Sequence, residues 1–182
     1  MSVSEAPDAT ETGRRDAVLE SALLTFARHG YRKTSMEEVA RAARISRPGL
    51  YFLFASKQDL FRAAVTRAIE RDLAAAEEIL ADPGKPLRER LAGAFDRWAG
   101  RYVGPMSRDV PAVIEQNPDL LGPITRTAPK RFEELVVAAV GGKAATGVAQ
   151  TLISASVGVK HQVETREAYL GRMTTAIGLL VP

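Results

Sequence analysis

The sequence predicts an all-α protein with about nine helices, on three observations. Apolar residues recur at intervals of three and four along most of the chain, which is the period of one helix face. Turn-forming pairs and triplets interrupt that period at Asp82-Pro83-Gly84, Gly104-Pro105 and Asn117-Pro118. No segment shows a convincing strand pattern. We therefore expect helices joined by short loops.

Composition excludes several classes of protein. The chain has 182 residues, of which 46% are hydrophobic and 26% charged, as in ordinary soluble domains. It has no cysteine, which excludes disulfides, thiolate metal sites, cysteine nucleophiles and iron–sulfur clusters, and we expect no cofactor or metal. No apolar run is long enough for a membrane helix or a secretory signal, so we expect a soluble, cytoplasmic protein without a membrane partner.

Charge is distributed unevenly along the chain. The net charge is +3, but residues 14–62 hold ten Lys and Arg against five Asp and Glu, whereas residues 1–13 carry three acids and no base. A concentrated basic excess is where a polyanion docks. We expect a disordered tail over 1–13, a nucleic-acid-binding domain over 14–62 and a second helical domain over 63–182.

Helix starts and stops in the first domain are marked by caps. A helix over 14–29 is followed by Gly30, the natural place for a left-handed turn. Ser35 with Glu38 three residues later forms a capping box, which predicts a short second helix. Ser46 predicts the start of a third helix, with Pro48 tolerated in its first turn, and Ser56 the start of a long fourth one.

The rest of the chain predicts further helices. A helix with the aromatic stripe Leu91, Phe95, Trp98 and Tyr102 follows the turn at 82–84. Residues 135–140 have the composition of a buried strand, but the flanking spacing favours a helix that ends at Gly141. The last two helices are predicted over 143–161 and 165–180.

Residues 35–54 have the plan of a helix-turn-helix: a capped short helix, a turn of about three residues and a second short helix. In that plan the second helix enters the major groove of DNA with its first residues near the base edges. Here it begins with Arg47, Pro48 and Gly49. Arginine makes the commonest specific contact, to guanine, and the two compact residues allow close approach.

The same region closely resembles the DNA-binding domain of TetR/AcrR-type transcriptional regulators. The residues in register with that family are Phe26, Gly30, Thr34, Ser35, Val39, Ala40, Ala43, Ile45, Ser46, Leu50, Tyr51, Phe54, Ser56, Lys57 and Leu60. The resemblance implies that Tyr51 and Lys57 contact phosphates, as does Thr34 or Ser35. A cation at a helix N-terminus, like Lys57, also indicates a bound anion. We expect the DNA-binding residues to be Thr34, Ser35, Arg44, Ser46, Arg47, Pro48, Gly49, Tyr51 and Lys57.

The sequence departs from the family pattern at two positions in this region. Arg44 stands in the turn where relatives have glycine; if the turn keeps a left-handed residue, the side chain costs roughly 1 kcal/mol. Leu53 stands where many relatives have a polar aromatic residue that reaches DNA.

Beyond residue 62 the resemblance extends only to helix number and length. It implies that the aromatic stripe, Leu91, Phe95, Trp98 and Tyr102, lines a cavity for a small apolar effector, although ordinary core packing is an alternative. It also implies that the last two helices pair with their copies in a homodimer. The residues predicted for that dimer interface are Val148, Leu152, Val159, Tyr169, Met173, Ile177 and Leu180.

Three functions remain open from the sequence. The favoured one is a dimeric regulator, a repressor released from a near-palindromic operator in double-stranded DNA by a small apolar ligand. The alternative within the same fold is a constitutive DNA-binding protein with a packed effector pocket. An enzyme is disfavoured, because the chain has only His29 and His161, no cysteine and no hydrolase or dinucleotide motif.

Overall fold

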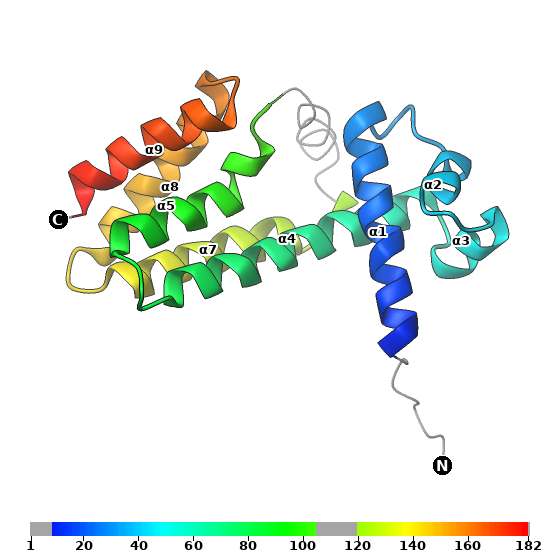
Figure 1. Ribbon diagram of the computed structural model, residues 1–182, viewed down its shortest axis with the longest axis horizontal. Helices are drawn as coiled ribbons and strands as arrows, with labels where there is room; N and C mark the ends of the chain where they lie inside the picture. The colour runs from blue at the N-terminus through cyan, green and yellow to red at the C-terminus, as the bar shows by residue number, and fades with distance from the viewer. Residues whose placement is uncertain (1–8, 105–119, 182) are drawn as a thin grey trace, which may run out of the picture. The chain divides into compact units, whose positions relative to one another are not determined.

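The computed structural model describes residues 9–104 and 120–181, and every regular element in those ranges is helical (Figure 1). This confirms the all-α prediction. The elements in chain order are α1 (Ala9–His29), α2 (Met36–Ala42), α3 (Arg47–Leu53), α4 (Lys57–Ala81), α5 (Leu87–Trp98), the 3₁₀ helix η1 (Gly100–Tyr102), α7 (Ile124–Val140), α8 (Ala145–Gln162) and α9 (Arg166–Leu180). None of the helices within these ranges is long and apolar enough to cross a bilayer.

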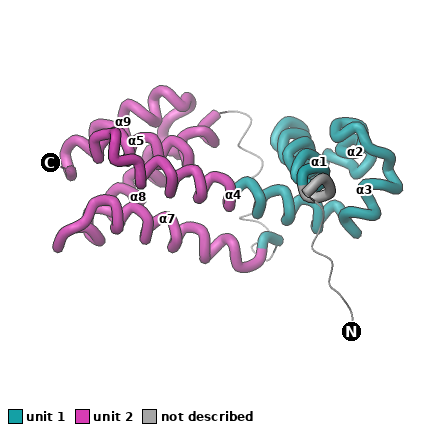
Figure 2. Tube along the Cα trace, turned by 60° about the horizontal axis from the view of Figure 1, so that its bottom comes forward, with its two compact units in different colours: residues 1–68, 109–121 teal, residues 69–108, 122–182 magenta. Residues whose placement is uncertain are grey.

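The chain folds into two compact units (Figure 2). The first comprises residues 1–68 with 109–121, and the second comprises 69–108 with 122–182. The division falls within α4, whose first turns belong to one unit and whose remaining turns belong to the other.

The first unit is held together by an aromatic cluster between α1 and α4. The rings of Phe26 and Phe61 meet edge to face with their centres 5.2 Å apart, and the Tyr31 ring lies 4.7 Å from that of Phe61. Helix α1 begins at Ala9, so the predicted start at Arg14 was wrong by more than one turn. Its end is as predicted: Gly30 adopts a φ of +81°, which glycine tolerates at little cost.

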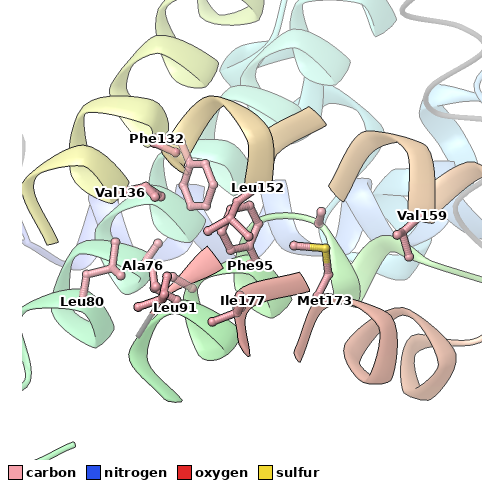
Figure 3. Close-up of a cluster of buried hydrophobic side chains, with 14 of the residues drawn as sticks. Ala76, Leu80, Leu91, Phe95, Phe132, Val136, Leu152, Val159, Met173 and Ile177 are labelled. Atoms are coloured by element: carbon pink, nitrogen blue, oxygen red, sulfur yellow. The ribbon is translucent and has the colours of Figure 1, made fainter. Parts of the chain in front are cut away.

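The second unit is a bundle in which α5, α7, α8 and α9 each pack against two of the others. Its core is a continuous cluster of buried apolar side chains contributed by these helices and by the second half of α4 (Figure 3). Phe95 and Phe132 meet edge to face at 5.2 Å at its centre. The packing of one amphipathic face from each helix explains why the sequence shows helical periodicity throughout.

Three of the helices predicted in the second unit are present, and one of them is shorter than predicted. The helix carrying the aromatic stripe was predicted to run through Tyr102, but α5 ends at Trp98 and the chain continues as the 3₁₀ turn η1. Residues 135–140 lie in α7, so the helical interpretation of that segment is confirmed. Helix α9 starts where predicted, because the hydroxyl of Thr165 accepts a hydrogen bond of 3.1 Å from the amide of Ala168.

Candidate nucleic-acid interface

Helix α2 is fixed by the predicted capping box. The hydroxyl oxygen of Ser35 accepts from the amide of Glu38 at 3.2 Å, and the Ser35 amide donates to the Glu38 carboxylate at 2.7 Å. The hydrogen bonds that the Ser35 amide and hydroxyl donate to this carboxylate lower the pKa of Glu38 and keep the carboxylate charged. Ser35 is exposed, as a phosphate contact requires, but both its hydroxyl and its amide are already used to begin the helix.

The turn between α2 and α3 is tight and contains one strained residue. Arg44 has a φ of +55°, the left-handed conformation that glycine adopts easily, so the expected strain at this position is present. The turn is held by hydrogen bonds from the Arg44 amide to the Arg41 carbonyl at 3.1 Å and from the Ile45 amide to the Ala40 carbonyl at 3.0 Å. The Arg44 side chain is exposed and is free to approach an anion.

Helix α3 presents one face to solvent and anchors the other. Its start is capped by Ser46, whose hydroxyl oxygen accepts from the Gly49 amide at 3.1 Å. Leu50 is fully buried and attaches the helix to the core of the unit. Its exposed side chains lie on the opposite side, at Arg47, Pro48, Tyr51 and Phe52.

Within this exposed face, Arg47 and Tyr51 form a pair. They are one helical turn apart, and the guanidinium carbon of Arg47 lies 5.7 Å from the centre of the Tyr51 ring. The contact holds a planar, always charged donor group beside a phenol while leaving both exposed. Such a pair can donate hydrogen bonds to base edges and phosphate oxygens together.

Lys57 contacts the loop before α2. Its ammonium donates to three backbone carbonyls of the loop before α2: those of Tyr31 at 3.0 Å, Thr34 at 3.1 Å and Arg32 at 3.4 Å. An ammonium has three donors, so a phosphate oxygen would have to displace one of these carbonyls. The loop therefore accounts for the position of this charge at the start of α4, and the phosphate contact of Lys57 stays a prediction.

Thr34 is placed differently from the prediction. Its side chain is buried, and its hydroxyl donates to the Gly30 carbonyl at 2.8 Å. The predicted phosphate contact from this side chain was therefore wrong: the hydroxyl closes the turn after α1. Sequence spacing places Thr34 beside Ser35 but does not show which of the two faces solvent.

Phe52 belongs to the exposed face of α3 and was not predicted. It lies one turn after Pro48, so the 3.6-residue period of a helix that exposes Arg47 and Pro48 could have indicated it. Leu53, the second departure from the family pattern, is half-buried. Its carbonyl accepts from the guanidinium of Arg15 at 3.3 Å, and Arg15 also lies over the Phe54 ring.

The residues predicted to line an effector cavity are packed in the second unit. Leu91 and Phe95 are fully buried in its core, and the ring of Trp98 stacks on Phe132 with the centres 4.8 Å apart. The Tyr102 hydroxyl donates to the buried carboxylate of Asp72. Burial, followed by this hydrogen bond, raises the pKa of Tyr102.

Asp72 connects α4 with the end of α5 and η1. Besides Tyr102 it pairs with the guanidinium groups of Arg97 at 3.1 Å and Arg101 at 2.8 Å. Its side chain is 2% exposed, whereas each arginine is about one-third exposed. This carboxylate was not predicted; its partners are 25 to 30 residues away in the sequence, so no local pattern marks it.

Most of the predicted dimer-interface residues belong instead to the core of their own unit. Leu152, Val159, Tyr169, Met173 and Ile177 are buried in the apolar cluster, and Val148 packs against it. Side chains enclosed in one protomer cannot meet a second copy, so the prediction was wrong for these buried residues. Leu180 is at the border of exposure.

A different set of residues on the last two helices faces solvent. Val157 on α8 and Leu179 on α9 are exposed large apolar side chains, with 56% and 81% of their surface accessible. A shallow groove lies between the two helices, lined by Ala155, Gly158, Gln162, Arg172, Thr175, Ala176 and Leu179 together with Val159. Exposed apolar side chains beside such a groove are candidates for contact with a partner.

The α2–turn–α3 arrangement, with an exposed and partly basic face on α3, defines a helix-turn-helix protein. Residues 18–64 match the family described as "Bacterial regulatory proteins, tetR family". This segment of the chain is therefore similar to the DNA-binding region of the TetR family.

Curated relatives match this chain over different lengths. The chain is 37% identical over 98 residues to the HTH-type transcriptional repressor ComR of Escherichia coli (strain K12), a match covering 54% of this chain and 45% of ComR. It is 26% identical over 175 residues to the HTH-type transcriptional regulator TcmR of Streptomyces glaucescens, covering 92% of this chain and 70% of TcmR. The match thus spans less than half the length of ComR.

The fold extends over the whole chain. A crystal structure of a TetR-family regulator from Mesorhizobium loti superimposes with a TM-score of 0.75, covering 95% of this chain and 97% of that one at 14% identity. A regulator from Haloarcula marismortui superimposes with a TM-score of 0.74 at 15% identity, covering 91% and 95%. These likenesses establish the fold of both units.

Proposed function

We propose that this protein is a DNA-binding transcriptional repressor that reads duplex DNA with the exposed face of α3. The observation that carries the proposal is the Arg47–Tyr51 pair: a guanidinium held over a phenol on the solvent side of a capped helix whose other side is buried. Base-edge readout requires such donors on a helix narrow enough for the major groove. The matches to repressors of the same family support this function.

The proposed DNA contacts are of two types, to base edges and to phosphates. Arg47, with Pro48 and Gly49 beside it, faces the base edges, whereas Tyr51, Arg44 and the capped ends at Ser35 and Ser46 face phosphates. Lys57 contributes to DNA binding indirectly, because its hydrogen bonds fix the loop that leads into α2. Phosphate contacts give affinity that falls with salt, and base contacts give sequence preference.

We propose further that the repressor is a homodimer on a near-palindromic operator. Two recognition helices one turn of DNA apart need two copies of the chain. The surface that supports dimerisation is the solvent side of α8 and α9, around Val157 and Leu179, in place of the buried residues first predicted.

The effector response has two candidate forms. Release by a small apolar ligand needs a cavity near Trp98 and Tyr102. The stacking of Trp98 on Phe132 and the hydrogen bond from Tyr102 to Asp72 favour the second candidate, a constitutive DNA-binding protein in which this region is packed. Stabilisation of the protein by members of an apolar compound library would support the first; no stabilisation by any of them would support the second.

The experiment that tests DNA reading is selection of binding sequences from a random duplex pool. We expect the wild-type chain to enrich a near-palindrome and Arg47→Ala to lose preference at one base pair of each half-site. Lys130→Ala, which removes an exposed charge from α7, is the matched control and should enrich the same sequence. Enrichment of no sequence by the wild-type chain would contradict the proposal.

A further inference from the structure

Phe52 is the most exposed of the large apolar side chains in the described residues, with 85% of its surface accessible to water. Its neighbours on α3 show that the exposure is not a property of the whole helix, because Leu50 and the capping residue Phe54 are buried. None of the ring contacts or cation–π contacts found within the described residues includes Phe52. The side chain therefore contributes little to the stability of the unit.

The position of Phe52 places it within the proposed DNA-reading face. Residues four apart lie on the same side of a helix, so Phe52 follows Pro48 as Tyr51 follows Arg47. The exposed face of α3 thus consists of two adjacent rows, one polar (Arg47 and Tyr51) and one apolar (Pro48 and Phe52). An element that enters the major groove with the polar row brings the apolar row with it.

The chemistry of the apolar row limits what it can recognise. Phenylalanine has no donor or acceptor, so it cannot read the hydrogen-bonding pattern of a base pair. The apolar group that a base presents in the major groove is the C5-methyl of thymine, and cytosine lacks it. An aromatic ring exposed to water gains free energy when it covers such a methyl group.

We propose that Phe52 is a specificity-determining residue that reads the C5-methyl group of one thymine in each half-site of the bound DNA. The inference rests on the proposed function and deepens it, since it adds thymine recognition by Phe52 to base recognition by Arg47. It predicts that one T·A pair per half-site is chosen for its methyl group and not for its hydrogen-bonding groups.

The test replaces thymine by deoxyuridine, which removes the methyl group and nothing else. Duplexes carrying the sequence enriched from the random pool are made with one thymine at a time changed in each half-site. For the wild-type chain we expect one substitution to weaken binding about fourfold per half-site, the effect of one buried methyl group. The full-length Phe52→Ala variant should bind thymine and deoxyuridine equally at that position.

Two controls make the result specific. Leu24→Ala removes an exposed apolar side chain from α1 of the same unit, and it should discriminate thymine from deoxyuridine as the wild type does. The Arg47→Ala variant should keep the methyl preference while losing preference at its own base pair. Because Phe52 is exposed, the thermal unfolding midpoint of Phe52→Ala should match that of the wild type.

The possible outcomes separate the two proposals. If Phe52→Ala binds DNA and still discriminates the same methyl group, or if the wild type discriminates none, the inference about Phe52 is overturned while DNA reading by α3 stands. If the wild-type chain enriches no sequence at all, the proposed function fails and this inference fails with it.

Discussion

The ammonium nitrogen of Lys57 lies 3.0 Å from the carbonyl oxygen of Tyr31 and 4.7 Å from the centre of the same residue's ring. One side chain at the start of α4 thus holds both the backbone and the ring of Tyr31, two residues after the end of α1. The loop over 31–34 leads directly into the cap of α2 at Ser35. The loop that leads into the helix-turn-helix is therefore held by a contact between segments more than twenty residues apart in the sequence.

Lys57→Met should lower the free energy of unfolding by about 1–3 kcal/mol, because it leaves carbonyl oxygens of the loop without their charged donor. Urea unfolding measures this loss. If Lys57 contacted phosphate, the same substitution would instead reduce the dependence of DNA affinity on salt by about one ion. Unchanged stability together with a reduced salt dependence would favour the phosphate role.

Arg47→Ala should weaken DNA binding by roughly 10-fold to 100-fold, the range for one bidentate contact to a base. The loss should be confined to DNA that carries the preferred base pair, so binding to unrelated duplex should change much less. Fluorescence anisotropy with both duplexes measures the two affinities. Equal losses on both would assign Arg47 to phosphate instead of base edges.

Asp72→Ala should destabilise the protein by about 3 kcal/mol, because it leaves Arg97 and Arg101 partly buried without their counter-charge. The control is Asp16→Ala, which removes the exposed partner of Arg67 at 2.6 Å and should cost no more than about 1 kcal/mol. Chemical unfolding of both variants compares them. Equal costs would mean that burial of Asp72 has no energetic consequence.

Leu179→Asp and Val157→Asp should each convert the proposed dimer into monomer. A charge placed inside an apolar interface should raise the dimer dissociation constant by roughly two orders of magnitude or more. Analytical ultracentrifugation measures the assembly state. Leu24→Asp, an equally drastic change at an exposed leucine of α1, should leave it unchanged. A dimer that tolerates both substitutions on α8 and α9 would place the interface elsewhere.

Stability should fall at high pH through Tyr169. Burial raises the pKa of this phenol to about 12, above its usual value of 10, in a site where it meets the Ser156 hydroxyl at 2.6 Å. Above pH 10 the unfolded chain loses a proton that the folded protein keeps, so the contribution is full below pH 10 and is lost as the pH rises toward 12. Between pH 8 and pH 11 the loss should be about 1 kcal/mol greater for the wild type than for Tyr169→Phe. Equal losses of stability for the wild type and Tyr169→Phe, measured by urea unfolding, would contradict this prediction.

Local sequence signals were sufficient to predict the helix-turn-helix. The cap residues Ser35, Ser46 and Ser56 each bind the amide three residues later, as predicted, because a cap acts within one turn of chain. The left-handed conformation at Arg44 was expected from its place in the turn. The polar and apolar rows on α3 follow from the helical period alone once Leu50 is known to be buried.

Contacts between distant segments were not predicted from the sequence. Helices α8 and α9 have apolar residues on both their inner and their outer sides, such as Leu152 and Val157, so periodicity identified the helices but not the side that faces the core. The partners of Lys57 and of Asp72 come from segments 23 to 30 residues away. Tyr102 was assigned to an apolar cavity by the family resemblance, and nothing in its sequence neighbourhood indicated the buried carboxylate of Asp72.

Directed cleavage of DNA from α3 tests the central claim most directly. The chain has no cysteine, so Pro48→Cys gives one attachment point for an iron–EDTA group in the middle of the exposed face. Ala138→Cys on α7 gives the control. We predict that the group on residue 48 cleaves the enriched duplex at two positions about one helical turn apart, and that the group on residue 138 does not. Uniform cleavage from residue 48, or the same pattern from both positions, would contradict the claim that this face of α3 lies in the major groove.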